Sequence, residues 1–213
     1  MRILFLLLIS VILFSCESEI PNPKKLGFQG IPTLEKQVNE KGDTVAVEVP
    51  FVVPPFRFLN QDSVFITNKD FENKIYVVDF FFTKCPSICP KMTKQMLRIH
   101  EKFKTDDRVA LISHSIDYVN DSVSVLKEHA QALGVTAPKW HFVECDRDQT
   151  YAFAKHYMNT AVENEEAPGG YEHSGYIVLI DKDGHLRSYA DGTSVEKIDI
   201  FMEDIKLLLK KMK

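Results

Sequence analysis

The chain has 213 residues, 45% of them hydrophobic, and a formal net charge of −4 at pH 7. This length suits one domain with extensions, and the hydrophobic content is ample for a core. Charges of both signs are mixed and the balance is mildly acidic, which argues against nucleic acid as the main partner. The four cysteines do not indicate a disulfide scaffold, because Cys16 and Cys145 lie far from the central pair.

The first fifteen residues are typical of a signal peptide. Arg2 precedes an apolar run over residues 3–14 that is too short to span a bilayer comfortably. The end of this run resembles the lipobox of bacterial lipoproteins, which implies that Cys16 is the lipidated first residue of the mature chain. Phe14 departs from that pattern, since a smaller residue is usual there. The alternative is an uncleaved membrane anchor, and both place the domain on a membrane outside the cytoplasm.

The next segment is polar and rich in proline and glycine, which favours a tether. We therefore expect a signal peptide at residues 1–15, a tether at 16–47 and one domain at 48–213. The alternation in Thr44–Val49 predicts a strand at the boundary of the last two.

Within the domain, hydrophobic periodicity predicts alternating strands and helices. In chain order these are strands at Phe56–Leu59 and Ser63–Ile66, a helical turn at Thr67–Phe71, a buried strand at Ile75–Phe82, a helix at Pro90–Phe103, a strand at Val109–Ile116, a helix from Asp121 or Ser122 to Leu133, a strand at Trp140–Cys145, a helix at Gln149–Met158, a hairpin at Tyr176–Ile180 and Leu186–Tyr189, and a helix at Val195–Leu209. This order predicts an α/β fold whose central mixed sheet has helices on both faces and ends in an antiparallel hairpin.

Cys85 and Cys89 are the candidate reactive residues. They lie where the buried strand meets the next helix, and the positive end of a helix favours thiolate, the form that binds metals and attacks disulfides. Side chains four residues apart share a helix face, at about 5–6 Å between Cβ atoms. That separation suits either one metal ion or a disulfide. A structural disulfide or two core thiols is the alternative.

Two thiolates leave a metal under-coordinated, and one imidazole would complete a set that suits Cu(I) and keeps Cu(II) accessible. His173 ends a polar loop just before a strand, although its position alone favours an ordinary loop histidine. The remaining candidates are weaker: His129 and His156 are expected to be solvated, His100 to point away, His114 to end a strand, and His185 to lie exposed in a hairpin. A zinc site that adds Cys145 and His141 to the thiol pair is a further alternative, although a buried thiol suits Cys145 better.

The segment Phe80–Met92 resembles the core motif of the Sco/SenC family, copper-binding proteins of thioredoxin-like fold that help assemble the copper site of cytochrome c oxidase. The family pattern is an apolar strand, Thr, Cys, Pro, two residues, Cys and Pro, and all of it stands here in register. Further matches follow at Ser115-Ile116-Asp117, Glu172-His173-Ser174, Asp181–Gly184 and Gly192-Thr193. The resemblance covers about Val49 to Met212.

This resemblance implies that Cys85, Cys89 and His173 are copper ligands. It also implies that Asp117 and Glu172 support them, with Glu172 standing where aspartate is common. A second departure is Tyr118-Val119-Asn120, which replaces a proline-led loop.

The expected function is delivery of copper, as Cu(I) or Cu(II), to the copper-receiving subunit of a terminal oxidase. We expect a monomer in the bacterial cell envelope, facing the periplasm and held to the membrane by a lipidated Cys16.

Two enzymatic alternatives remain. One is a membrane-anchored thiol–disulfide oxidoreductase that uses Cys85 and Cys89 to reduce partner cysteines. The other is peroxide reduction, for which the chain offers only a generic thiolate.

Overall fold

The computed structural model describes residues 26–144 and 146–212. The predicted signal peptide, Cys16 and Cys145 lie outside these residues. The described chain forms a seven-stranded sheet of order β11-β10-β5-β6-β7-β3-β4. Its strands are β3 (Arg57–Asn60), β4 (Phe65–Thr67), β5 (Ile75–Phe81), β6 (Val109–Ser115), β7 (Trp140–Glu144), β10 (Tyr176–Ile180) and β11 (Leu186–Asp191).

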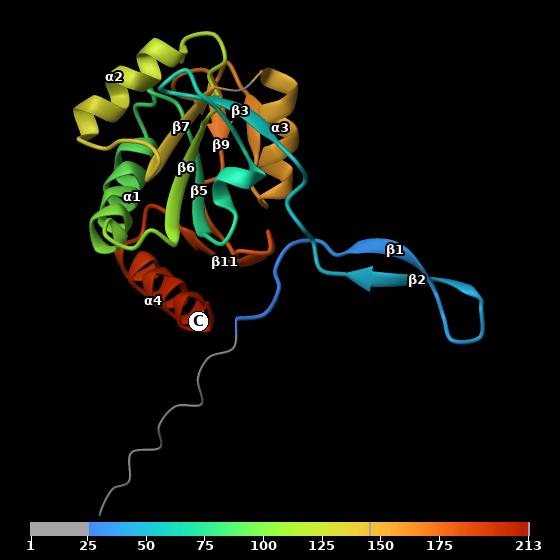
Figure 1. Ribbon diagram of the computed structural model, residues 1–213. Coiled ribbons are helices and arrows are strands. Elements are labelled where there is room, and N and C mark those ends of the chain that lie inside the picture. Colours follow the sequence, from blue (N-terminus) through green and yellow to red (C-terminus); the bar gives the residue numbers. More distant parts are fainter. Residues whose placement is uncertain (1–25, 145, 213) are drawn as a thin grey trace, which may run out of the picture.

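Four α-helices cover this sheet: α1 (Cys89–Phe103), α2 (Val123–Leu133), α3 (Arg147–His156) and α4 (Val195–Lys211). A short 3₁₀ helix, η1 (Asn68–Phe71), precedes β5. Right-handed crossovers from β5 to β6 and from β6 to β7 place α1 and α2 on one face. There α4 joins them, whereas α3 lies on the other side of the sheet (Figure 1). Helices on both faces explain why β5 and β6 are buried at every position.

The sheet is mixed, as its sequence pattern predicts. β5, β6 and β7 are parallel, whereas β10 runs antiparallel to β5 and pairs with β11 in the predicted hairpin. This confirms the α/β thioredoxin-like fold expected from the sequence. The hairpin turn therefore lies at the amino end of β5, and the segment with the two cysteines leaves its carboxyl end.

The described chain begins at the end of the sheet that lies away from the cysteines. Leu26 is buried there, and Arg187 donates hydrogen bonds from Nη2 to the carbonyl oxygen of Leu26 (2.5 Å) and from Nε to that of Gly27 (3.2 Å). The backbone N–H of Gln29 donates to the carbonyl oxygen of Leu186 at 2.8 Å. The N-terminal segment is thus attached to the start of β11.

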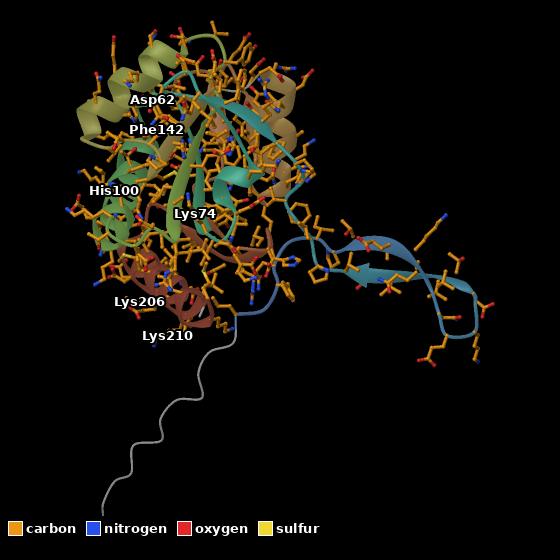
Figure 2. The ribbon with its side chains drawn as sticks, viewed as in Figure 1. Asp62, Lys74, His100, Phe142, Lys206 and Lys210 are labelled. Atoms are coloured by element: carbon orange, nitrogen blue, oxygen red, sulfur yellow. The ribbon has the colours of Figure 1, made fainter. Side chains whose placement is uncertain are left out.

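Part of the segment expected as a tether is ordered differently. β1 (Thr33–Val38) and β2 (Thr44–Val49) pair as an antiparallel hairpin that projects from the body, and its side chains stand clear of it (Figure 2). Every residue of β1 is exposed. No helix among the described residues is both long and apolar enough to cross a bilayer.

The polar loop predicted before His173 is the turn of a second small hairpin. β8 (Ala161–Glu163) pairs with β9 (Tyr171–His173), outside the main sheet. These strands have only three residues each, so they leave little periodicity in the sequence.

Candidate metal centre

The two cysteines sit on the connection between β5 and α1. The backbone N–H of Cys85 donates to the carbonyl oxygen of Phe82 at 3.2 Å, which closes a turn directly after the strand. α1 begins at Cys89, with Pro90 in its first turn where no hydrogen-bond donor is lost. No acidic residue lies in that turn, so nothing there opposes a negative charge on the sulfurs.

His173 reaches the same place as the last residue of β9, where it pairs with Ala161 of β8. Phe82 contacts the ring of His173 edge-on, with centroids 6.2 Å apart. Gly169, in the turn between β8 and β9, has φ +89°, and a Cβ there would lie 2.7 Å from a Phe82 ring carbon. Only a glycine lets the hairpin approach Phe82 this closely.

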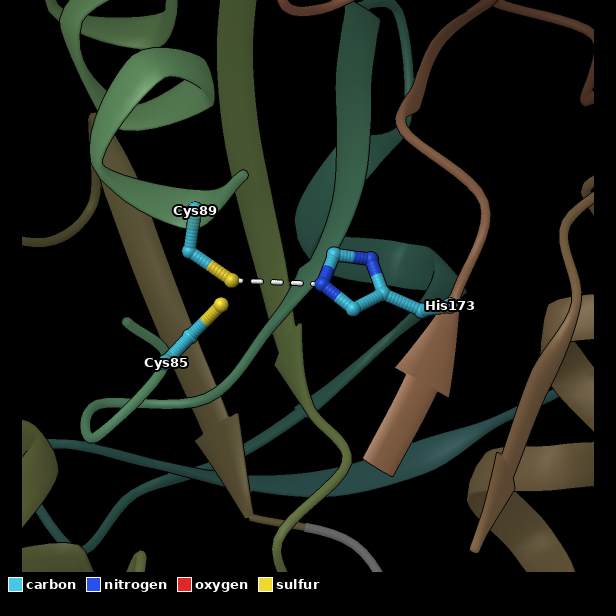
Figure 3. A group of neighbouring side chains, drawn as sticks. All are labelled: Cys85, Cys89 and His173. Carbon is cyan, nitrogen blue, oxygen red and sulfur yellow. Dashed lines mark hydrogen bonds between the residues drawn. The ribbon is translucent and has the colours of Figure 1, made fainter. Parts of the chain in front are cut away.

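The three side chains converge. Figure 3 shows both sulfur atoms and the imidazole facing a common point, and the Nε2 atom of His173 lies 3.2 Å from the Sγ atom of Cys89. The ligand atoms of Cys85, Cys89 and His173 all lie within 4.8 Å of one another, and all three residues are buried. Among the described residues this is the only group of three or more His, Cys, Asp or Glu side chains so placed.

The protonation states within this group are unequal. Burial raises the pKa of the Cys85 thiol, but hydrogen bonds from the thiol of Cys89, from Ser87 and from the backbone together bring that pKa below its ordinary value. Burial, together with donation to Cys85, raises the pKa of Cys89 well above its ordinary range. Cys89 therefore keeps its proton to a higher pH than Cys85 does.

Burial favours the neutral form of the His173 imidazole. Burial lowers its pKa, while the hydrogen bond to the backbone at Ser174 partly offsets this effect. Its Nδ1 atom lies 3.2 Å from the carbonyl oxygen of Ser174. A carbonyl oxygen only accepts hydrogen bonds, so Nδ1 carries the proton and the lone pair of Nε2 faces the sulfur of Cys89.

Asp117 is buried in the loop after β6 and supports the β8–β9 hairpin rather than contacting Cys85, Cys89 or His173. Its Oδ1 atom accepts a hydrogen bond from the hydroxyl of Tyr171 at 3.1 Å. Glu172 is exposed, and its carboxylate accepts from Nδ2 of Asn164 at 3.2 Å. Successive strand residues point to opposite faces, so the structure does not bring Glu172 to the site with His173.

The remaining histidines differ in part from expectation. His100, as predicted, points away from the sulfurs and packs on Trp140 with ring centroids 5.8 Å apart. His156 is exposed as predicted, but the expectation of solvation is wrong for His129, which stacks on Phe81 at 5.3 Å. His185 is half-buried rather than exposed, since it packs against the segment of Phe51. Its Nδ1 lies 2.9 Å from the carbonyl oxygen of that residue.

The other two candidates lie in the interior. His114 is fully buried between the rings of Phe58 and Phe80. His141, the histidine of the zinc alternative, has its Nδ1 atom 3.1 Å from Nδ2 of Asn60, and Cys145 lies outside the described residues. Neither ring belongs to the group formed by Cys85, Cys89 and His173.

Comparison with known proteins places this geometry in a family. The SCO1/SenC family model matches residues 46–210. The chain belongs to the SCO1/SenC family. A SCO1/SenC family lipoprotein from Bacillus anthracis str. Ames is 26% identical, with a TM-score of 0.68 over 75% of this chain and 95% of its own.

Two further Sco structures are similar. BsSco, described as having a disulfide switch and as a member of the Sco family of cytochrome c oxidase assembly proteins, is 28% identical, with a TM-score of 0.64 over 73% of this chain and 92% of its own. Arabidopsis thaliana ScoI, solved with copper bound, is 20% identical, with a TM-score of 0.63 over 76% and 99% of the two chains. At 20% identity, the similarity to the Arabidopsis structure establishes only that the two proteins share a fold.

Sequence reasoning missed the residues that hold His173 in place. Gly169 belongs to the segment predicted as a polar loop and Tyr171 directly follows it, and nothing local shows that Tyr171 reaches Asp117. The pair Gly169-Gly170 indicates a turn, which with the neighbouring Val162 and Tyr171 could have suggested a hairpin.

Proposed function

We propose that this protein binds one copper ion through Cys85, Cys89 and His173 and delivers it to a copper-receiving subunit of a terminal oxidase. The observation that carries the proposal is the convergence of two sulfurs and one imidazole nitrogen within 4.8 Å. Thiolate ligands select Cu(I), and the added imidazole makes Cu(II) accessible to the same site. Membership of the SCO1/SenC family supports copper as the cargo.

Delivery follows from ligand exchange. A partner that presents its own sulfur and imidazole ligands displaces those of this site one at a time, so the ion is never released to water. The neutral His173 is the ligand that leaves most readily, because no charge is separated when it does. The two thiolates then hold Cu(I) until the partner's ligands replace them.

The test is a copper titration of the domain from residue 26 onward, under reducing and oxidising conditions. We expect one copper per chain. His173→Ala should weaken Cu(II) binding far more than Cu(I) binding, because two thiolates alone suffice for Cu(I). The matched control is His156→Ala, since His156 is exposed on α3. Equal copper binding by a Cys85→Ser, Cys89→Ser double variant would end the proposal.

A second function is favoured by the unequal thiols. Cys85 has a lowered pKa and Cys89 a raised one, which suits attack by the first sulfur on a partner disulfide. The mixed disulfide is then resolved by Cys89, so the partner gains two electrons and two protons while Cys85 and Cys89 become a disulfide. Reduction of a partner disulfide at an unchanged rate with copper chelated would favour this role. In that case His173→Ala should have little effect.

We also propose that Cys16 is lipidated and holds the domain on the outer side of a membrane. The similar lipoprotein from Bacillus anthracis supports this. Leu26 is attached at the end of the sheet opposite the thiols. This arrangement is consistent with a lipid anchor at Cys16, because the thiols then face away from the membrane. Radiolabelled palmitate incorporation, lost in Cys16→Ser, is the test.

A further inference from the structure

The turn that carries Cys85 is attached to a neighbouring loop by one carboxylate. Thr83 is the second residue of this turn, which the N–H of Cys85 closes on the carbonyl oxygen of Phe82. Both polar groups of Thr83 bind Asp121: the backbone N–H donates to Oδ2 at 3.0 Å, and the hydroxyl donates to Oδ1 at 2.5 Å. Two bonds to one carboxylate fix the orientation of Thr83 as well as its distance. The position of Cys85 therefore depends on Asp121.

Asp121 is itself firmly held. The residue is buried, and its Oδ2 atom also accepts a hydrogen bond from Oγ of Ser115, the last residue of β6, at 2.6 Å. All three partners of the carboxylate donate, which suits an ionised carboxylate because that group only accepts. Hydrogen bonds to a charged group are stronger than neutral ones, and loss of one leaves a buried acceptor unsatisfied.

The loop that contains Asp121 also holds the other half of the metal centre. Asp117 accepts the hydroxyl hydrogen bond of Tyr171, which lies in β9 with His173. The backbone N–H of Asp121 donates to the carbonyl oxygen of Asp117 at 3.0 Å. Nδ2 of Asn120 donates to both carboxylate oxygens of Asp117, at 3.0 and 2.8 Å. Residues 117–121 thus form one hydrogen-bonded loop that directs a carboxylate to each half of the centre.

We propose that Asp121 is a positioning residue for copper binding. It fixes the turn of Cys85 against the same loop that, through Asp117, fixes the strand of His173. The loop thereby sets the separation of sulfur and imidazole before an ion arrives. Groups that are ordered in advance lose less conformational freedom when the ion binds, so affinity rises. The inference rests on the proposed function of the metal centre and adds a residue outside the three ligands that determines its affinity.

The first test needs no copper, and it leaves Asp121 in place because removal of the carboxylate would leave three donors unpaired. Thr83→Val keeps the shape of the side chain but loses the hydroxyl, whereas Thr83→Ser retains it. In the reduced, metal-free domain we expect hydrogen exchange of the Cys85 amide to be about ten-fold faster in Thr83→Val and unchanged in Thr83→Ser.

Ser188→Ala is the matched control for this exchange measurement. It removes a hydroxyl–carboxylate hydrogen bond of 2.6 Å to Asp204. Ser188 pairs with Leu179, which in turn pairs with Val77 in the half of β5 that lies away from the cysteines. The variant should therefore leave exchange of the Cys85 amide unchanged.

Cu(II) binding is the second readout. Thr83→Val should bind Cu(II) about ten-fold more weakly and shift the thiolate-to-Cu(II) absorption band, and Thr83→Ser should restore both. When Thr83→Val is combined with Tyr171→Phe, the loss of affinity should be well below the product of the two single losses. The reason is that either change already frees one half of the centre from the loop.

Three outcomes would overturn the proposal: unchanged exchange of the Cys85 amide in Thr83→Val, equal effects of Thr83→Val and Ser188→Ala, or independent losses of Cu(II) affinity in the double variant. If the wild-type domain binds no copper, the proposed function fails, and the exchange comparison still decides whether Asp121 positions the turn.

Discussion

The hydroxyl of Tyr171 donates to Oδ1 of Asp117 across 3.1 Å, although 54 residues separate the two in the chain. This bond ties β9, which ends at His173, to the loop after β6. On the neighbouring strand β8, Glu163 accepts hydrogen bonds from the hydroxyl of Tyr118 (2.8 Å) and from Nε of Arg147 (2.7 Å). Both strands of the hairpin are thus attached to the body, which keeps the imidazole beside the sulfurs before any ion arrives.

Loss of the hydrogen bond between Tyr171 and Asp117 should let the His173 imidazole move, while Cys85, Cys89 and His173 all stay in place in the sequence. We expect Tyr171→Phe to weaken Cu(II) binding about ten-fold, because the hydrogen bond to the Asp117 carboxylate is lost. Cu(I) binding should change less, since the thiolates dominate it. Competition titrations with a chelator measure both. Tyr189→Phe, which alters an exposed tyrosine of β11, is the control, and equal effects of the two variants would contradict this account.

The turn of the same hairpin offers a matched pair of glycines. Gly169 and Gly170 have φ +89° and +86°, but only at Gly169 would a Cβ meet a neighbour, the ring of Phe82. Gly170→Ala should cost about 1 kcal/mol of unfolding free energy, from backbone strain alone.

For Gly169→Ala we expect a loss of about 2–4 kcal/mol, because strain and overpacking add. Copper affinity should fall as well, since the hairpin must move away from Phe82. Urea denaturation and copper titration of both variants provide the measurement. The idea fails if the two variants are indistinguishable.

Most of the fold could be predicted because its central elements have strong periodicity. β5 is apolar at every position except Asp79, which is typical of a strand covered on both faces. In α1 the apolar residues Met92, Met96 and Ile99 recur at helical spacing. Cys85 and Cys89 could be placed with them, because a strand-to-helix junction is a local feature. His173 needed the family resemblance, because no local pattern shows that β9 returns to the sulfurs.

What escaped prediction depends on contacts between distant parts of the chain. His129 was expected in water because it lies on an amphipathic helix, yet the rings of Phe81 and Phe142 enclose it. β1 was missed because all of its residues are exposed and only Leu34 and Val38 are apolar. Its partner β2 was predicted at Thr44–Val49, because valine alternates with other residues there, whereas β1 has no comparable alternation.

The inequality of the thiols predicts which one reacts first. Thiolate is the nucleophile, and Cys85 has the lower pKa because Cys89 and Ser87 donate hydrogen bonds to it. With less than one equivalent of iodoacetamide at pH 7, mass spectrometry should find the label mainly on Cys85. Ser87→Ala should slow this labelling, and Ser122→Ala, at an exposed serine before α2, should leave it unchanged. Preferential labelling of Cys89 would refute the assignment.

Asp79 should make stability depend on pH in a direction opposite to that of most carboxylates. It is buried in β5, and Oγ of Ser113 donates to its Oδ1 at 2.5 Å. Burial raises the pKa of Asp79 to about 7, and the bond from Ser113 only partly offsets this effect. Between pH 4 and 7 the unfolded chain has therefore lost a proton that the folded chain keeps. The contribution of Asp79 to stability falls as pH rises through this window and is constant above it.

The change due to Asp79 is up to about 4 kcal/mol, but buried histidines act against it. Burial lowers the pKa of His114 to about 3 and that of His141 to about 4, so their contributions rise with pH up to about 6.5. The informative quantity is thus the difference in unfolding free energy between Asp79→Asn and wild type. Urea unfolding of the metal-free domain should show this difference shifting by several kcal/mol in favour of Asp79→Asn from pH 4.5 to 7.5. A difference that stays constant over that range would show that Asp79 is ionised in the folded protein, because only a retained proton produces the slope.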